Sequence, residues 1–376
     1  MKKILFLLIA AILIFSLVLS SCQEKESIKV GYVGTLSGSN SDLSVFGRNG
    51  ALMAVEIVNE AGGINGRMLE LIVKDDKNDK SVALQVDNEF YKEGVTAIIG
   101  HMTSGMAELT VPFINEHKIL MISPTIAADS LSSRDDYFFR MIPSNKHQAI
   151  GISEAMLQKN LRKAAIIYDN SNQSFAEALK NKFREDYVMQ GGEIVLEKSF
   201  NPITVDYKGI SNDIIESGAD GVFIIAAADN AVMICQNFYK RGAKMNIFLP
   251  SWAMTNDLLS HGGKSVEDAT LVNFYDNESK NSKYKTFEAA FLSKYGSKPS
   301  FSAQFSYEAV MVLSEAMVHS EELNSESLKQ EIINSKVFNG LQGILFFDET
   351  GDMSRTKYLY KVRDGKFILL EKGDSI

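Results

Sequence analysis

Residues 96–123, TAIIGHMTSGMAELTVPFINEHKILMIS, decide the fold class of this chain. Two short apolar runs, 96–100 and 119–122, enclose a longer stretch, 104–116, that predicts a helix. Short apolar runs bounded by turn residues are typical of strands buried in a parallel sheet. The segment therefore predicts a strand–helix–strand unit of an α/β protein.

The same alternation continues on both sides of this unit. A polar break at 144–147 separates two series of similar length, which predicts two lobes, each a mostly parallel sheet flanked by helices. The tail, 346–370, predicts short strands and a turn at Asp364 and Gly365. The other expected strands are 28–33, 69–73, 165–168, 192–198, 221–226 and 247–249, and the clearest helices of the second series are 175–189, 207–217 and 230–241.

The N-terminus predicts export and lipid anchoring. Two lysines precede an apolar run over 4–19, and Leu-Ser-Ser leads into Cys22. This pattern is typical of a secretory signal, and its end resembles a bacterial lipobox, in which the cysteine thiol takes a diacylglycerol. The alternatives are an ordinary signal or an uncut anchor, but the run is shorter than the ~20 residues of a spanning helix. We expect residues 1–22 to be a lipoprotein signal and 23–27 a tether that holds the protein outside the cytoplasm, on a membrane surface.

Composition excludes several classes of protein. The net charge of −8 and the absence of a Lys/Arg cluster interleaved with aromatics argue against nucleic acid as a partner. The two cysteines are Cys22 and Cys235, so lipid on the first leaves no internal disulfide. Cys235 lies in an apolar stretch and is expected to be a buried structural thiol.

No catalytic or metal-binding motif is found, so we expect neither an enzyme nor a cofactor. The run 261–265, HGGKS, resembles the end of a phosphate loop but has Leu258 where the motif needs glycine, and it predicts a polar turn. Asp75 and Asp76 follow a strand and predict a solvated turn or helix start. Five histidines lack partners at metal-ligand spacing and are expected at surface or loop positions: His101, His117, His147, His261 and His319.

Three loops after expected strands carry ligand-binding chemistry. Ligands of open α/β sheets bind beyond the carboxyl ends of the strands. The loop 34–47 carries Phe46, the loop 100–105 carries Thr103 and Ser104, and the loop 123–127 follows the next strand. Each alone fits a plain helix cap, but three successive strand ends with hydroxyls and amides favour a small anionic ligand.

The same segments resemble the branched-chain amino-acid (leucine/isoleucine/valine) binding family, the solute receptors of ABC importers. The resemblance covers nearly the whole chain. It rests on IKVG at 28–31 with LSG at 36–38, AGGINGR at 61–67, IIGH at 98–101, ILMISP at 119–124 and FDETGD at 347–352.

This resemblance implies a two-lobed type I periplasmic binding protein, or Venus flytrap. Lobe one is expected to comprise 27–145 plus 273–354, and lobe two 146–272 plus 355–376. A ligand in the cleft closes the lobes, and the closed form docks on an ABC permease. A sensor of the same fold that feeds a signalling partner remains the alternative.

The resemblance also assigns ligand-binding positions. It places the loop serine that grips the ligand carboxylate at Ser104, and the residues that follow Ser-Pro at Thr125 and Ala127, the latter replacing a threonine. The aromatic positions of the pocket fall on Phe46 and Phe175. The remaining family positions, a tyrosine and the acid that pairs with the ammonium group, fall on Ala228 and Trp252.

The carboxylate side of the site is thus retained, whereas the ammonium side departs from the family. A buried ammonium without a counter-charge is costly. Asp229 can substitute, or Trp252 can stack on an apolar group, face a cation or serve as a hinge or core residue. Tyr275 and Gln304 are further cleft candidates. We expect the ligand to be a small carboxylate, an amino acid or a related apolar or aromatic acid.

Overall fold

Two sheets organise the chain, and the computed structural model describes them through residues 25–38 and 41–375. The first sheet has the order β2-β1-β3-β4-β5 and is parallel throughout. Its strands are β1 (Ile28–Gly34), β2 (Leu69–Asp75), β3 (Ala97–Ile99), β4 (Leu120–Ser123) and β5 (Phe138–Arg140).

The second sheet has the order β15-β14-β10-β9-β8-β6-β7. Its five strands from β10 to β7 are parallel, and β14 and β15 extend it as antiparallel edge strands. The bounds are β6 (Lys163–Asp169), β7 (Glu193–Phe200), β8 (Gly221–Ile225), β9 (Asn246–Leu249), β10 (Thr270–Asn273), β14 (Thr356–Arg363) and β15 (Lys366–Ser375). The predicted α/β class with two mostly parallel sheets is confirmed.

Both sheets share one doubly wound topology. The order β2-β1-β3-β4-β5 recurs as β7-β6-β8-β9-β10, so each sheet has a switch point, between β1 and β3 and between β6 and β8. Ligands of such sheets bind outside the carboxyl ends of the strands, next to the switch point. The site is therefore expected where these two edges face each other.

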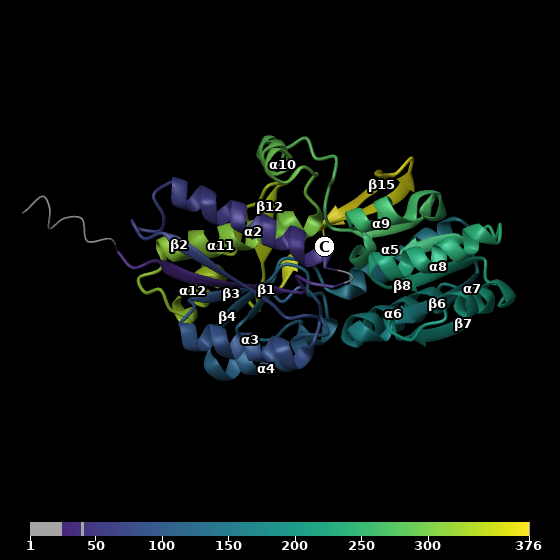
Figure 1. Ribbon diagram of the computed structural model, residues 1–376, viewed down its shortest axis with the longest axis horizontal. Helices are drawn as coiled ribbons and strands as arrows, with labels where there is room; N and C mark the ends of the chain where they lie inside the picture. Colours follow the sequence, from purple (N-terminus) through teal and green to yellow (C-terminus); the bar gives the residue numbers. More distant parts are fainter. Residues whose placement is uncertain (1–24, 39–40, 376) are drawn as a thin grey trace, which may run out of the picture.

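Helices cover both faces of each sheet (Figure 1). On the first sheet, α3 and α4 share one apolar layer with Val33 and Ile98, and α2 and α11 share the opposite one with Tyr32 and Ile99. Gly50 lets α2 and α11 approach closely, because a Cβ there would lie 1.9 Å from the carbonyl oxygen of Ala303. These helices are α2 (Asp42–Glu60), α3 (Lys80–Glu93), α4 (Ala107–His117), α10 (Ser282–Tyr295), α11 (Phe301–His319) and α12 (Ser325–Ser335).

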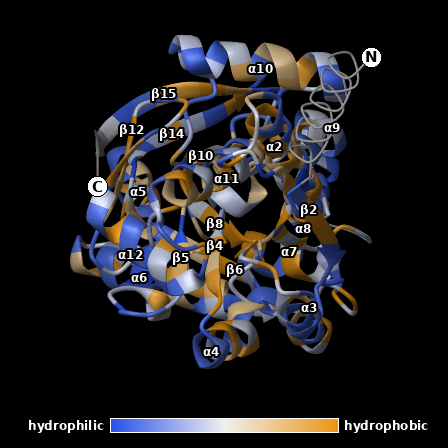
Figure 2. Ribbon diagram, turned by 90° about the vertical axis from the view of Figure 1, so that its left-hand side faces the viewer, coloured by the Kyte–Doolittle hydropathy of each residue, from blue (hydrophilic) through white to orange (hydrophobic). Residues whose placement is uncertain are grey.

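The helices of the second sheet are built from the middle of the chain. They are α5 (Asn145–Gln158), α6 (Gln173–Met189), α7 (Tyr207–Glu216), α8 (Ala228–Lys240) and α9 (Asn256–Gly262). Cys235 on α8 is completely buried, as predicted, and burial raises the pKa of its thiol to about 12. Figure 2 shows the hydrophobic strands in the middle of the molecule and hydrophilic outer turns on α3 and α4.

The chain passes from one sheet to the other three times. After β5 it enters α5 at Asn145, so the expected break at 144–147 is in fact a helix start. After β10 it returns to the first sheet through α10, α11 and α12, and a small antiparallel sheet of β11 (Val337–Asn339), β12 (Ile344–Phe347) and β13 (Met353–Ser354) follows. It then adds β14 to the second sheet, and Asp364 and Gly365 form the predicted turn before β15. Among the described helices, none has the length and apolar character needed to cross a bilayer.

Candidate functional site

A cavity lies between the two sheets at the carboxyl ends of their strands. Its free volume is only about 20 Å³, well below the ~300–1,000 Å³ typical of small-molecule sites, so its walls must move apart to admit a ligand. The loops after β3, β4, β6 and β9 all contribute to it, as the doubly wound topology requires. Its described lining residues are Leu43, Met102, Thr103, Ser104, Thr125, Asn172, Phe175, Ser251, Trp252 and Phe301.

Five of the residues singled out in the sequence meet in this cavity. Thr103, Ser104 and Thr125 come from the first sheet, and Phe175 and Trp252 come from the second. Residues separated by up to about 150 positions in the chain are brought together by the facing strand ends. The site therefore combines hydroxyl groups from one side with aromatic rings from the other.

The other predicted residues do not line this cavity. Ala127 lies behind its wall, where its amide donates to Ser104. Phe46 stacks on Phe291 of α10 with 5.9 Å between ring centres. Ala228 and Asp229 begin α8. The Tyr275 hydroxyl lies 2.6 Å from that of Tyr284. Gln304 lies inside α11 and donates to Glu308.

Ser104 is poised to donate a hydrogen bond. Its side chain is buried, and its Oγ accepts from the Ala127 amide at 3.3 Å. Within the described part of the chain its own hydroxyl proton has no acceptor. Thr125 differs, because its hydroxyl donates to the Met102 carbonyl oxygen at 2.5 Å and so offers only lone pairs to a ligand. The pair thus presents one donor and one acceptor.

The opposite wall is apolar and aromatic. The rings of Phe175 and Trp252 meet edge to face, 5.5 Å between centres and 73° between planes, which is a favourable aromatic geometry. Leu43, Met102 and Phe301 add apolar contacts from the first-sheet side. This surface suits contacts with an apolar or aromatic group, while Ser104 offers a polar contact.

No charged side chain is found among the described lining residues. Asp229, the predicted substitute partner for an ammonium group, instead faces His261 at 2.8 Å, and this hydrogen bond raises the pKa of His261 despite partial desolvation. Ligand atoms of Asp229, Asp257 and His261 lie within 4.8 Å of one another. The ion pair and helix contacts account for this grouping, so a cation is not required.

Direct contacts join the two sides around the cavity. The Gly105 amide donates to the Asn172 side-chain oxygen at 2.8 Å, in a buried bond. The Ser174 hydroxyl donates to Glu108 at 2.5 Å, and the carboxylate of Asp42 accepts from the Asp257 amide at 3.4 Å. The two sides are therefore in a closed arrangement.

Asn172 and Ser251 are site residues that the sequence reasoning missed. Both directly follow strands of the second sheet, Asn172 after β6 and Ser251 after β9. The strand-end rule that pointed to the loops 100–105 and 123–127 applies equally to them. Applied to the second series of strands, it identifies both positions.

One histidine corrects the sequence prediction. His101 lies in a loop, as predicted, but it is completely buried rather than at the surface, and its ring nitrogens lie 2.9 Å from Asp76 and 3.2 Å from Asp87. Asp76, expected in a solvated turn, is only 1% exposed. Burial alone lowers the pKa of His101, but the charge of Asp87 and the hydrogen bonds to both carboxylates outweigh it and raise the pKa to about 9.

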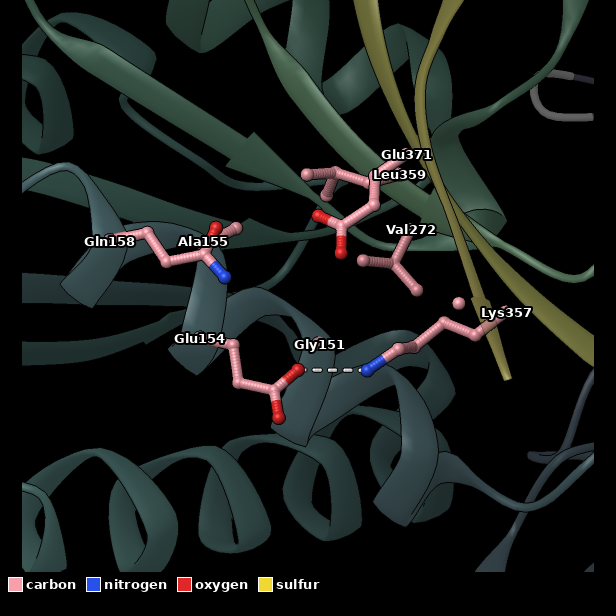
Figure 3. A pocket seen from close by; sticks show the side chains of 9 residues that line it. Gly151, Glu154, Ala155, Gln158, Val272, Lys357, Leu359 and Glu371 are labelled. Carbon is pink, nitrogen blue, oxygen red and sulfur yellow. Dashed lines mark hydrogen bonds and ion pairs between the residues drawn. The ribbon is translucent and has the colours of Figure 1, made fainter. Parts of the chain in front are cut away.

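A separate hollow lies within the second sheet's own layers (Figure 3). Its wall comes from α5, β10, β14 and β15, and Glu154 pairs with Lys357 across it at 2.8 Å. None of the predicted site residues lines it. Because all of its wall belongs to one side of the molecule, closure between the two sides does not act on it.

Comparisons with known proteins match nearly the whole chain. The family model described as periplasmic binding protein matches residues 27–366. The leucine-, isoleucine-, valine-, threonine- and alanine-binding protein of Pseudomonas aeruginosa is 24% identical over 332 residues, covering 87% of each chain.

Solved structures share the fold. The branched-chain amino acid transporter substrate-binding protein of Streptococcus pneumoniae, in complex with isoleucine, superposes with a TM-score of 0.85 at 24% identity, covering 92% of this chain and 99% of that one. A solute-binding protein of R. palustris in complex with benzoate gives a TM-score of 0.85 at 18% identity, covering 93% and 97%. The predicted two-lobed type I architecture is confirmed.

Proposed function

The chain belongs to the periplasmic binding protein family, and from this we propose that it is the lipid-anchored solute-binding protein of an ABC importer. The family consists of solute-binding proteins, so the chain is not an enzyme. The observation that carries the proposal is the cavity between the two sheets, with Ser104 on one wall and Trp252 on the other. A ligand that touches both walls favours the closed form and thereby signals occupancy to a permease.

The lining favours a small acid with an apolar body. Hydroxyls of Thr103, Ser104 and Thr125 gather on the first-sheet side, where the Ser104 proton suits a carboxylate oxygen. The rings of Phe175 and Trp252 suit an aromatic or branched group. The relatives bind ligands of this chemistry: isoleucine in one and benzoate in another.

We propose further that the preferred ligand lacks an amino group. An ammonium in this cavity meets no carboxylate among the described lining residues, and Asp229 is engaged with His261. Burying a charge without a partner is costly. A carboxylate alone is better served, because hydroxyl and amide donors suffice to hold it.

Calorimetry with matched ligand pairs tests this. L-phenylalanine and 3-phenylpropanoate differ only in the amino group, as do L-leucine and 4-methylpentanoate, and benzoate extends the series. The amine-free acid of each pair is expected to bind more tightly. Tight binding of the amino acids alone would refute the amine-free ligand class, and no binding across the series would refute the proposed receptor for small acids.

The lobes are proposed at 27–145 plus 273–354 and at 146–272 plus 355–376. Sheet membership supports these bounds, since β1 to β5 form one sheet and β6 to β10 with β14 and β15 form the other. Cys22, the proposed lipid attachment site, lies outside the described residues. With residues 23–27 as a tether, the lipid would keep the receptor at the extracytoplasmic face of the membrane that holds the permease.

A further inference from the structure

A histidine and two aspartates form a buried charged triad directly behind the binding loop. His101 Nδ1 lies 2.9 Å from Asp76 Oδ2, and Nε2 lies 3.2 Å from Asp87 Oδ1. None of the three side chains is more than 1% exposed. They come from three places, the turn after β2, helix α3 and the second residue of the 100–105 loop, so the triad joins separate elements (Figure 1).

Two facing carboxylates favour a doubly protonated ring. A carboxylate only accepts hydrogen bonds, so two facing carboxylates require both ring nitrogens to donate, as they do in imidazolium. Asp87 and Asp76 are the only charged groups among the described residues that act on the ring, and they raise the pKa of His101 against the effect of burial. Asp76 is itself held, since its other oxygen accepts from the Thr35 hydroxyl and the Asn78 amide.

The loop that carries His101 is then bonded residue by residue to the loop after β4. The Ser123 hydroxyl donates to the His101 carbonyl oxygen at 2.7 Å. The Thr125 hydroxyl donates to the Met102 carbonyl oxygen at 2.5 Å, and the Ala127 amide donates to Ser104 Oγ at 3.3 Å. The loop is thus held from two sides, by the ring contacts at His101 and by these three bonds to the loop after β4.

We propose that Asp76, His101 and Asp87 are positioning residues of the binding site, which clamp a doubly protonated ring and thereby hold the 100–105 loop ready for the ligand. The expected effect on ligand binding rests on the proposed function, whereas the effect on the loop rests on the contacts described above. None of the triad touches the cavity. Directional bonds fix an orientation, which an apolar residue packed at the same place does not do.

Asp87→Asn tests the clamp, because it keeps the shape of the side chain and removes its charge. Glu93→Gln is the matched control, since it removes the same charge from the exposed side of the same helix, where Glu93 pairs with Lys74. Amide hydrogen exchange of residues 100–106 at pH 8 is expected to rise about three- to tenfold in Asp87→Asn, the range set by loss of one hydrogen bond. Exchange in lobe two, and throughout Glu93→Gln, is expected to stay at the wild-type rate. Wild-type exchange of the loop in Asp87→Asn would overturn the proposal.

Two further measurements separate this inference from the proposed function. In wild-type protein without ligand, ¹⁵N shifts of the His101 ring at pH 8 are expected to show both nitrogens protonated, and a neutral ring contradicts the clamp. The second measurement uses 3-phenylpropanoate or L-phenylalanine, whichever binds wild type more tightly. Affinity for this probe is expected to fall about three- to tenfold in Asp87→Asn. Unchanged affinity removes the positioning role. If wild type binds neither probe, the proposed ligand class fails, while the ring shifts and the exchange rates still decide the inference.

Discussion

Replacing Ser104 by alanine tests the donor end of the cavity most directly. Its Oγ accepts from the Ala127 amide and has a free proton to give a ligand. A hydrogen bond to a charged group contributes about 1.5–3 kcal/mol, so Ser104→Ala is expected to weaken binding of a carboxylate by roughly 10- to 150-fold. For the corresponding neutral amide, where an ordinary hydrogen bond contributes about 0.5–1.5 kcal/mol, the loss should be clearly smaller.

The assay is calorimetry with 3-phenylpropanoate and 3-phenylpropanamide on both proteins. Ser211→Ala is the control, because Ser211 is completely buried in lobe two and its hydroxyl donates to the Tyr207 carbonyl oxygen at 2.8 Å. Ser211→Ala removes a buried hydroxyl bond away from the cavity, so this variant should bind both ligands as tightly as wild type does, even if its melting temperature falls. If Ser104→Ala binds the acid within about twofold of wild type, Ser104 does not hold the ligand and the carboxylate must be placed elsewhere.

Because the folded pKa of His101 is raised from 6.5 to about 9, the free energy of unfolding should be highest below pH 6.5 and fall by at most about 3 kcal/mol as the pH rises through 9. Urea titrations should show this pH dependence in wild type and a flatter one in His101→Gln. Asn172→Ala removes the bond from the Gly105 amide, and should weaken acid binding about two- to tenfold without lowering the melting temperature of ligand-free protein; an unchanged affinity would exclude this bond from closure. Cys22→Ala should move the protein from the membrane to the soluble fraction after cell lysis, and a membrane-bound variant would rule out Cys22 as the anchor.

The sequence predicted the sheets well where the signal is local. β8 is an apolar run of five residues, and β1 and β2 are mainly apolar stretches of seven residues between turns, so composition and period identify them. β5 was not predicted, because it has only three residues and ends in Arg140, a charged side chain that is only 1% exposed. That arginine is satisfied by Asp352, more than 200 positions later, at 2.8 Å. Nothing within a short window indicates such a strand.

The strand-end positions of the site were predictable on both sides, although the rule was applied only to the first series of strands, whereas the contacts between the two sides were not predictable. Ser104 and Thr125 follow β3 and β4, so their place at the sheet edge can be inferred from the chain alone. Asn172 matters because the second lobe closes onto Gly105, and the relative position of the lobes is a tertiary property. His101 was misjudged for the same reason, since its partners Asp76 and Asp87 lie 25 and 14 residues away in the chain.

The distribution of charge around the cavity bears on ligand choice. Behind the 100–105 loop, His101 offsets the carboxylates of Asp76 and Asp87, and no charged side chain is among the described lining residues. Fixed dipoles that point at one end of a cavity stabilise charge only at that end. In the proposed binding mode the carboxylate meets the Ser104 hydroxyl, and an amine next to it would face the rings of Phe175 and Trp252 with no carboxylate among the described lining residues. Under the proposed function, this distribution would favour an apolar acid over its amino derivative.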